Sequence, residues 1–339
     1  MRHCRAAMTG LAFAAAALML GSATSPLHAE DITVLTWGTT WQSAIQPAAE
    51  LFTKQTGIGV NVQTQASSGE GLVKLQAMKD KPAVDVWFTT SSVADRARED
   101  TALFAQLPVK DMKNWGEVID GAKTPYYVAA YYYPLSIIWR PDLAPKQITG
   151  WQDLWDPAFK NKLGVPNMSM FQGRMLLVSA LLNGGSEQNV DPGFVALKRL
   201  KPNVVMFYGS DAQARQALAQ GEISVLVAPP SQAKRMTDQG IKVEIISPKP
   251  TPMMYDVMML VHTPRETAAA RFIDFMLGKE AQQIISDRLN MGPVNRNAPA
   301  AESLKAALPK PGDEVSFNEG VLNKEIGAWT DRFNREIAQ

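Results

Sequence analysis

The sequence has 339 residues, of which 34 are Lys or Arg and 33 are Asp or Glu, so its formal net charge is +1. This balance argues against a strongly basic nucleic-acid-binding protein, and the 46% hydrophobic and 20% charged content argues against a disordered or collagen-like chain. No apolar run long enough to span a membrane follows residue 30, which excludes a polytopic membrane protein, and the length allows about two domains.

The first 29 residues have the layout of a secretory signal peptide. Two arginines precede an uninterrupted apolar run at 11–20, and small, turn-prone residues follow it. We expect export with cleavage after Ala29, and a cut after Ala23 is the alternative. Cleavage would remove Cys4, the only cysteine, and both arginines, which leaves 32 basic residues against 33 acidic ones. The mature chain would therefore have no disulfide and no thiol chemistry.

Strands and helices alternate along the rest of the chain. Hydrophobic patterns predict strands at 32–36, 58–62 and 84–88, with amphipathic helices between them. This alternation at short spacing predicts a parallel sheet with crossover helices. It returns later in the chain, with predicted strands at 204–207, 223–227 and 243–246 and predicted helices at 211–220 and 231–239.

Two long extended stretches interrupt the alternation. Residues 126–139 are aromatic and β-branched, and residues 248–261 are rich in proline and then apolar. We interpret both as strands that cross between two lobes. The predicted fold is α/β, with two lobes on parallel-core sheets joined by crossover hinge strands. Lobe I would hold 30–128 plus 255–339, and lobe II would hold 129–254.

An ordered set of short motifs resembles a known protein family. Trp37-Gly38, Ser67-Ser68-Gly69-Glu70 and Pro82-x-x-Asp85-Val86 come first, then Trp151-x-Asp153-Leu154-x-Asp156-Pro157, and finally 271–276, Glu280-Ala281-Gln282 and Gly292-Pro293-Val294-Asn295. In this order they resemble the type 2 periplasmic solute-binding proteins of ABC importers, in extracellular solute-binding family 1. The branch closest in character binds polyamines, ferric ion and organophosphonates.

The resemblance implies a periplasmic-binding-protein-like II fold with a solute-binding cleft between the lobes. It also implies a periplasmic monomer that delivers a small solute to the permease subunits of an ABC transporter in the inner membrane. No cofactor, metal or nucleic acid is expected. Because ligands of open parallel sheets bind outside the carboxyl ends of the strands, the residues that follow predicted strands are the candidate ligand contacts.

Trp37 ends the first predicted strand, and Thr39 and Trp41 follow it closely. We interpret Trp37 as an aromatic wall of the cleft and Thr39 as a hydroxyl donor there, because loops at strand ends carry sites on rigid scaffolds. The alternative is that Trp37 packs the lobe and Thr39 caps the next helix. For Trp41 the two interpretations are evenly balanced.

Ser67, Ser68 and Gly69 end the second strand and open a helix. Their hydroxyls and free backbone N–H groups suit an anion or carboxylate, and a simple N-cap is the alternative. Thr89 and Thr90 follow the third strand and are candidates by the same reasoning.

Tyr255 and Asp256 lie in the second crossover, where a carboxylate is unusual inside an apolar run. Burying it without a partner would be costly, so we expect it to bind a ligand amine or to pair with a Lys or Arg of the protein. Tyr208 and Ser169, which follow predicted second-lobe strands, are further candidates for the cleft.

Catalysis finds little support in the sequence. There is no phosphate-binding Gly-x-x-x-x-Gly-Lys loop and no Gly-x-Ser-x-Gly motif, and after signal cleavage His262 would be the sole histidine. The usual nucleophile–base pairs and a metal site are therefore not expected. A secreted carboxylate-dependent hydrolase remains the alternative of another class, although only Glu70 and Asp256 are acids at predicted strand ends.

The resemblance also bears on the solute. Asp256 matches an acid that polyamine binders of the family use, but 168–175 carries Arg174 and none of the expected acids, and Ala228-Pro229-Pro230 stands where an aromatic is expected. Ferric binders use adjacent tyrosines late in the second lobe, and no such pair follows Tyr133. We therefore expect a small zwitterion or organic anion, with a polyamine such as spermidine or putrescine as the alternative.

Overall fold

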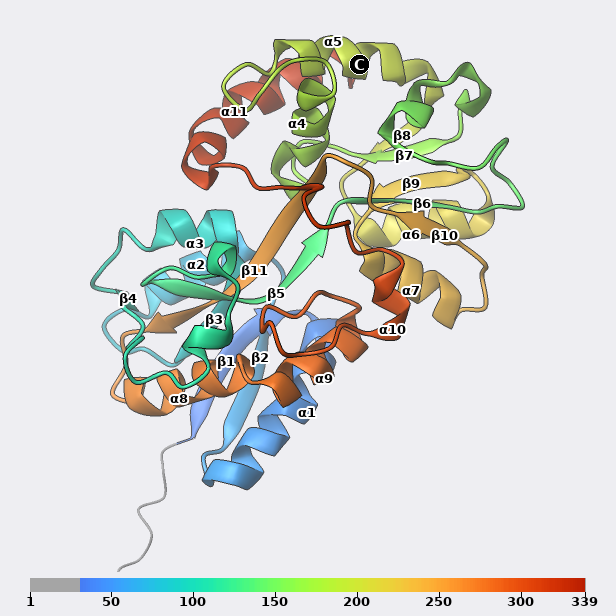
Figure 1. Cartoon of the computed structure of the whole chain (residues 1–339). Helices are drawn as coiled ribbons and strands as arrows, with labels where there is room; N and C mark the ends of the chain where they lie inside the picture. The colour runs from blue at the N-terminus through green and yellow to red at the C-terminus, as the bar shows by residue number, and fades with distance from the viewer. Residues whose placement is uncertain (1–30, 339) are drawn as a thin grey trace, which may run out of the picture.

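The computed structural model describes residues 31–338, so the predicted signal peptide lies outside the described residues. Within 31–338 the strands form a seven-stranded and a five-stranded sheet. Each sheet is the centre of one lobe, and Figure 1 shows the two lobes joined by long strands. The fold is mixed α/β with a parallel core in each sheet, as predicted from the alternating hydrophobic patterns.

The first sheet has the order β12-β11-β3-β1-β2, and β4 and β5 also pair with β11. β1 pairs in parallel with β2 and β3, whereas β11 runs antiparallel to β3 and β5. The strands are β1 (Ile32–Trp37), β2 (Val60–Gln65), β3 (Val86–Thr90), β4 (Phe104–Ala105), β5 (Tyr127–Pro134), β11 (Thr251–Val261) and β12 (Glu314–Val315).

Helices cover the first sheet because each has one apolar face. In the first of them, Ile45, Ala48 and Phe52 repeat at helical spacing and are buried, and Gly57 ends the helix at a positive φ of 76°. The helices that pack on this sheet are α1 (Thr39–Thr56), α2 (Ser68–Ala77), α3 (Ser91–Ala97), α8 (Glu266–Met276) and α9 (Lys279–Leu289).

The second sheet has the order β10-β6-β9-β7-β8, with β7 parallel to both β8 and β9. Its strands are β6 (Ser136–Trp139), β7 (Leu163–Pro166), β8 (Val204–Tyr208), β9 (Val225–Ala228) and β10 (Glu244–Ile246). The helices of this lobe are α4 (Arg174–Leu181), α5 (Asp191–Leu200), α6 (Asp211–Gln220) and α7 (Pro230–Asp238), and the short α10 (Glu302–Lys305) lies later in the chain.

The two predicted extended stretches do cross between the sheets. β5 belongs to the first sheet and β6 to the second, and β10 and β11 make the return crossing. β5 and β11 pair along most of their length, so the two crossovers form one ribbon through the middle of the molecule (Figure 1). A third crossing after β12 leads into α11 (Glu319–Glu336), which the sequence patterns did not predict.

The expected lobe assignment of 255–339 needs a correction at α11. Phe333 of this helix packs edge-on against Phe207 of β8, with ring centroids 5.1 Å apart, and Arg332 lies 4.1 Å from the ring centroid of Phe194. The C-terminal half of α11 therefore lies beside α5 on the second lobe (Figure 1), while Glu319 and Asn323 near its start contact α3 of the first lobe. The chain passes from the first sheet to the second at Leu135, because β5 pairs with β11 up to Pro134. The expected lobe boundary was 128/129.

Candidate functional site

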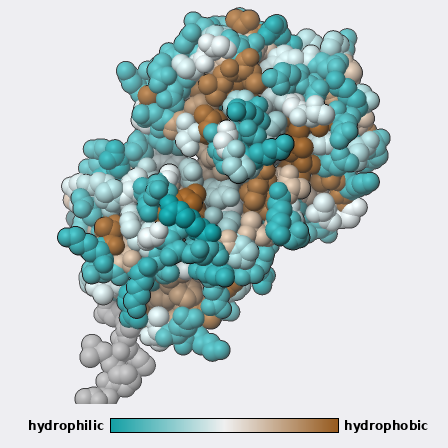
Figure 2. Space-filling view, in the orientation of Figure 1, coloured by the Kyte–Doolittle hydropathy of each residue, from teal (hydrophilic) through white to brown (hydrophobic). Residues whose placement is uncertain are grey.

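A cleft with a volume of about 690 Å³ lies between the two lobes. The ends of β1, β2 and β3 line it from the first lobe, and residues at the starts of α4, α6 and α7 line it from the second. The β5–β11 ribbon contributes Tyr133 and 254–256 between these walls. Figure 2 shows the two lobes as separate bulges that meet at a waist.

Two tryptophans stand at the end of β1. Trp37 is its last residue and Trp41 lies in the first turn of α1, and both line the cleft with their ring centroids 6.0 Å apart. Both are partly exposed rather than buried in the core. The position after a parallel strand brings them to the cleft, which favours the cleft-wall interpretation of Trp37 over core packing.

The loop after β2 combines two roles. Ser67 is the N-cap of α2, since its Oγ accepts a hydrogen bond from the Glu70 backbone N–H at 3.1 Å. The Glu70 carboxylate accepts one from the Ala66 N–H at 3.2 Å, one residue before this N-cap. Ser68 and Gly69 follow and line the cleft, and their N–H groups lie in the first turn, where no helical acceptor is available. Glu70 is thus occupied by capping and is a poor second acid for a hydrolase.

Asp256 of β11 lines the cleft and is only 5% exposed. The Tyr133 hydroxyl donates a hydrogen bond to its Oδ1 at 3.2 Å, and the Tyr131 hydroxyl also donates to this carboxylate. Burial raises the pKa of Asp256 from 3.8 to about 7, although these two hydrogen bonds lower it. Among residues 31–338 no Lys or Arg forms an ion pair with Asp256, so the expected alternative of a protein cation as its partner is not what the structure shows.

The second-lobe wall begins with a strained turn. Phe171, Gln172 and Gly173 have φ values of 49°, 50° and 67°, in the left-handed region that non-glycine residues rarely adopt. The turn carries the Gln172 amide to the hydroxyl of Ser92 on the first lobe. Arg174 follows, 2% exposed, and its guanidinium forms an ion pair with Glu319 of α11 at 2.8 Å.

Asp211, the first residue of α6, is a second acid of the cleft that the sequence analysis missed. Burial raises its pKa to about 6, and the charges of Arg235 and Arg215 lower it. Its Oδ2 accepts a hydrogen bond from Gln232 at 3.2 Å. The signal was present, because Asp211 comes four residues after the predicted strand at 204–207.

Most of the predicted contacts meet in this cleft, namely Trp37, Ser67, Ser68, Gly69, Thr90, Ser169, Tyr255 and Asp256. Three others do not line it. Thr39 is exposed at the start of α1, and Thr89 is fully buried because neighbouring residues of a strand point to opposite faces and Thr90 takes the cleft side. Tyr208 is a core residue of the second lobe, 1% exposed, and its hydroxyl donates to the Val227 carbonyl at 2.6 Å.

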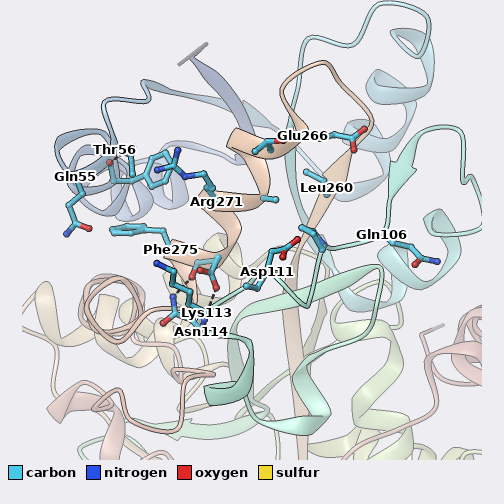
Figure 3. Close-up of a pocket in the computed structure, with 16 residues that line it drawn as sticks. Gln55, Thr56, Gln106, Asp111, Lys113, Asn114, Leu260, Glu266, Arg271 and Phe275 are labelled. Atoms are coloured by element: carbon cyan, nitrogen blue, oxygen red, sulfur yellow. Dashed lines mark hydrogen bonds between the residues drawn. The ribbon is translucent and has the colours of Figure 1, made fainter. Parts of the chain in front are cut away.

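Another cavity, of about 520 Å³, lies on the first lobe away from the interlobe cleft. Figure 3 shows Arg271 and Phe275 of α8 on one side of it and Asp111, Lys113 and Asn114 on the other. Of its charged lining residues, Asp111, Lys113 and Arg271 are exposed to solvent, while Glu266 contacts His262 and Asp274 accepts a hydrogen bond from the Asn114 backbone N–H. None of them therefore needs a ligand as a partner. The interlobe cleft, which holds a buried and unpaired carboxylate, is the better candidate site.

Comparison with known proteins agrees with this geometry. Residues 48–310 match the family described as bacterial extracellular solute-binding protein. The chain belongs to this family. No helix within 31–338 combines the length and the apolar character that a membrane span requires.

Two characterised relatives and one solved structure are similar over nearly the whole chain. The spermidine/putrescine-binding periplasmic protein of Salmonella typhimurium is 24% identical over 332 residues, which cover 93% of this chain and 92% of the relative. The gamma-aminobutyric acid-binding protein of Pseudomonas aeruginosa is 25% identical over 345 residues, covering 96% and 92%. The crystal structure of an ABC transporter substrate-binding protein from Bradyrhizobium japonicum has the same fold, with a TM-score of 0.78, 20% identity and coverage of 92% and 100%.

Proposed function

We propose that this protein is the substrate-binding component of a bacterial ABC importer and that it captures a small zwitterion with an ammonium group. The observation that carries the proposal is Asp256, a buried carboxylate in the wall of the cleft with two tyrosine donors and no cationic partner among residues 31–338. A buried charge without a counter-charge is costly, and a ligand ammonium would supply that charge. Both relatives above are named for amine-bearing solutes, which supports the assignment.

Groups suited to the anionic end of such a solute lie elsewhere in the cleft. The first-turn N–H groups of α2 at Ser68 and Gly69 point out of a helix N-terminus, where the helix dipole favours negative charge. The aliphatic middle of the solute would pack on apolar side chains that line the cleft between them, such as Trp37 and Met254. A molecule of the type of 4-aminobutyrate matches this distribution of charge.

A diamine is the second candidate, and Asp211 is the observation that favours it. This acid faces the same cleft as Asp256 and would offer a second carboxylate to a second ammonium. Against it, Arg235 and Arg215 already lower the pKa of Asp211 through their charges, so part of its negative charge is compensated by the protein.

Calorimetric titration with two nearly isosteric ligands tests the choice. 4-Aminobutyrate and putrescine have similar length and differ at one end, where a carboxylate replaces an ammonium. We expect 4-aminobutyrate to bind more tightly, and glutarate, which has no amine, to bind far more weakly than either. Tight binding of putrescine alone would establish the diamine alternative, and tight binding of glutarate would contradict the role of Asp256.

Further parts of the proposal concern the setting of the protein. We infer a periplasmic monomer, exported by a signal peptide that is cleaved after Ala29, which binds its solute without converting it and hands it to membrane permease subunits. The layout of residues 1–29 and the family of the chain support this. Intact-mass analysis of exported protein should show loss of the predicted segment, and mass spectrometry of the released solute should show it chemically unchanged.

A further inference from the structure

Trp41 of the cleft wall makes one hydrogen bond to a buried side chain of the β5–β11 ribbon. Its indole Nε1–H donates to the hydroxyl oxygen of Tyr131 at 2.7 Å. Tyr131 lies on β5 directly opposite Asp256 of β11 and is fully buried. The indole of Trp41, in contrast, is partly exposed and lines the cleft. A residue of the cleft wall is thus linked through one buried hydroxyl to the acid of the proposed amine site.

The direction of these hydrogen bonds follows from counting protons. A tyrosine hydroxyl has one proton, and an indole N–H can only donate. Because the Tyr131 oxygen accepts from Trp41, its own proton is free to go to the neighbouring Asp256 carboxylate. Burial raises the pKa of Tyr131 well above its ordinary value, so the hydroxyl remains a donor throughout the neutral pH range.

We propose that Trp41 is a positioning residue of the amine site, because its N–H holds the Tyr131 hydroxyl as a donor to Asp256 and so keeps this carboxylate ready to accept an ammonium group. The proposal rests on the proposed function for the identity of the ligand, but not for the arrangement of the three side chains. Hydrogen bonds in a chain also polarise one another, so the Trp41 N–H strengthens the bond from Tyr131 to the carboxylate.

The charged and titratable groups around this chain come from both lobes. On β5, Tyr133 donates to Asp256 at 3.2 Å. From the second lobe, Asp211 and Arg174 act on Tyr133 through their charges. Arg235 of α7 lies with its guanidinium carbon 5.8 Å from the centroid of the Trp41 ring, so a cation of the second lobe contacts the indole across the cleft. Among residues 31–338, the groups that act on the pKa of Asp256 itself are the hydroxyls of Tyr131 and Tyr133.

The test is Trp41→Phe, which keeps an aromatic ring next to Trp37 and removes the N–H. The Tyr131 hydroxyl is then free to turn away from Asp256, and the pKa of Asp256 should rise by about 0.5 to 1 unit. Since an ammonium binds the ionised carboxylate, affinity for 4-aminobutyrate at pH 6 should fall about three- to tenfold, while affinity at pH 8.5 should stay within about threefold of the parent.

Two variants serve as controls. Tyr131→Phe removes the donor itself and should shift the pH profile in the same direction by at least as much. Trp37→Phe changes the neighbouring cleft-wall ring, which makes no hydrogen bond recorded within 31–338, and should change affinity by the same factor at every pH. An equal loss at pH 6 and pH 8.5 in Trp41→Phe would overturn the proposal and leave Trp41 as a packing or direct ligand contact.

A readout without ligand separates this proposal from the proposed function. The pKa of Asp256 can be followed by carbon NMR of its labelled carboxyl group in the ligand-free protein, with Asp256→Asn to assign the signal. A higher value in Trp41→Phe than in the parent supports the positioning role even if no amine binds at any pH, in which case only the proposed solute is wrong. An unchanged value in a folded Trp41→Phe protein rejects the positioning role whatever the solute is.

Discussion

Replacing Asp256 by Asn removes the charge on which the proposed amine site depends and keeps the shape of the side chain. The folded pKa of Asp256 is raised from 3.8 to about 7 because burial disfavours the charged form. For a group with a raised pKa, the folded protein holds a proton that the unfolded chain has lost. Its contribution to stability is therefore fully present below pH 4 and disappears as the pH rises through about 7.

The size of this effect can be bounded. A difference of about three pKa units, at ~1.4 kcal/mol each, destabilises the ligand-free protein at pH 8 by at most ~4 kcal/mol. Asn removes this cost, but its NH2 group replaces one carboxylate oxygen and cannot accept a hydrogen bond from a tyrosine hydroxyl, which takes back ~1–2 kcal/mol. We therefore expect Asp256→Asn to unfold at a higher temperature than the parent at pH 8, by roughly 1–3 kcal/mol in free energy, and to lose this advantage at pH 5.

Affinity should change in the opposite direction. Removing one partner of a buried charge pair typically costs ~2–5 kcal/mol, so 4-aminobutyrate should bind at least about tenfold more weakly to Asp256→Asn. Thermal melts at pH 5 and pH 8, together with calorimetric titration, measure both effects on the same protein. A lower melting temperature at pH 8 in the ligand-free variant would refute the reasoning, because it would mean that the carboxylate stabilises the fold through a protein cation.

The other predictions concern the cleft wall and the lobes. Trp37→Ala should weaken solute binding with little change in the melting temperature of the ligand-free protein, because this ring is partly exposed. A large decrease in that melting temperature would mean that Trp37 is a core residue. Phe333→Ala should lower the free energy of unfolding by ~3–5 kcal/mol, as chemical denaturation would show, since the ring is buried against Phe207. Glu319→Gln should cost ~3–5 kcal/mol in the same assay, because it leaves the buried Arg174 guanidinium without its counter-charge. Small-angle scattering should show a smaller radius of gyration with bound solute, and an unchanged radius despite calorimetric binding would argue against lobe closure.

The sequence predicted the scaffold well because periodicity reports on burial. Three of the first sheet's strands fall within two residues of their predicted starts, for example β1 at Ile32–Trp37 and β3 at Val86–Thr90. In a parallel sheet the carboxyl ends of the strands meet at one edge. Correct prediction of the strands therefore also identified most of the predicted residues that line the cleft. The loop at Ser67 shows the same point, since capping and cleft lining were both expected there and the structure has both.

The errors come from side-chain direction and from contacts distant in sequence. Thr89 and Thr90 are identical in type, and only the register of β3 against β11 places the first in the core and the second at the cleft. Tyr208 looked like a cleft residue because it ends a strand, but its hydroxyl satisfies a carbonyl of β9 inside the lobe. The position of α11 depends on pairs such as Phe207 with Phe333, which no local pattern reveals.

The charge of the cleft rather than its fold decides between a zwitterion and a diamine. Asp256 and Asp211 both line it, but they differ in what surrounds them. Asp211 has Arg235 and Arg215 nearby, whose charges lower its pKa, whereas the groups that lower the pKa of Asp256 are neutral hydroxyls. Asp256 therefore depends on the solute for a positive charge more than Asp211 does. The second ammonium of putrescine would approach Asp211, whose negative charge Arg235 and Arg215 partly compensate. The repulsion between this ammonium and the two arginines favours a solute with a single amine.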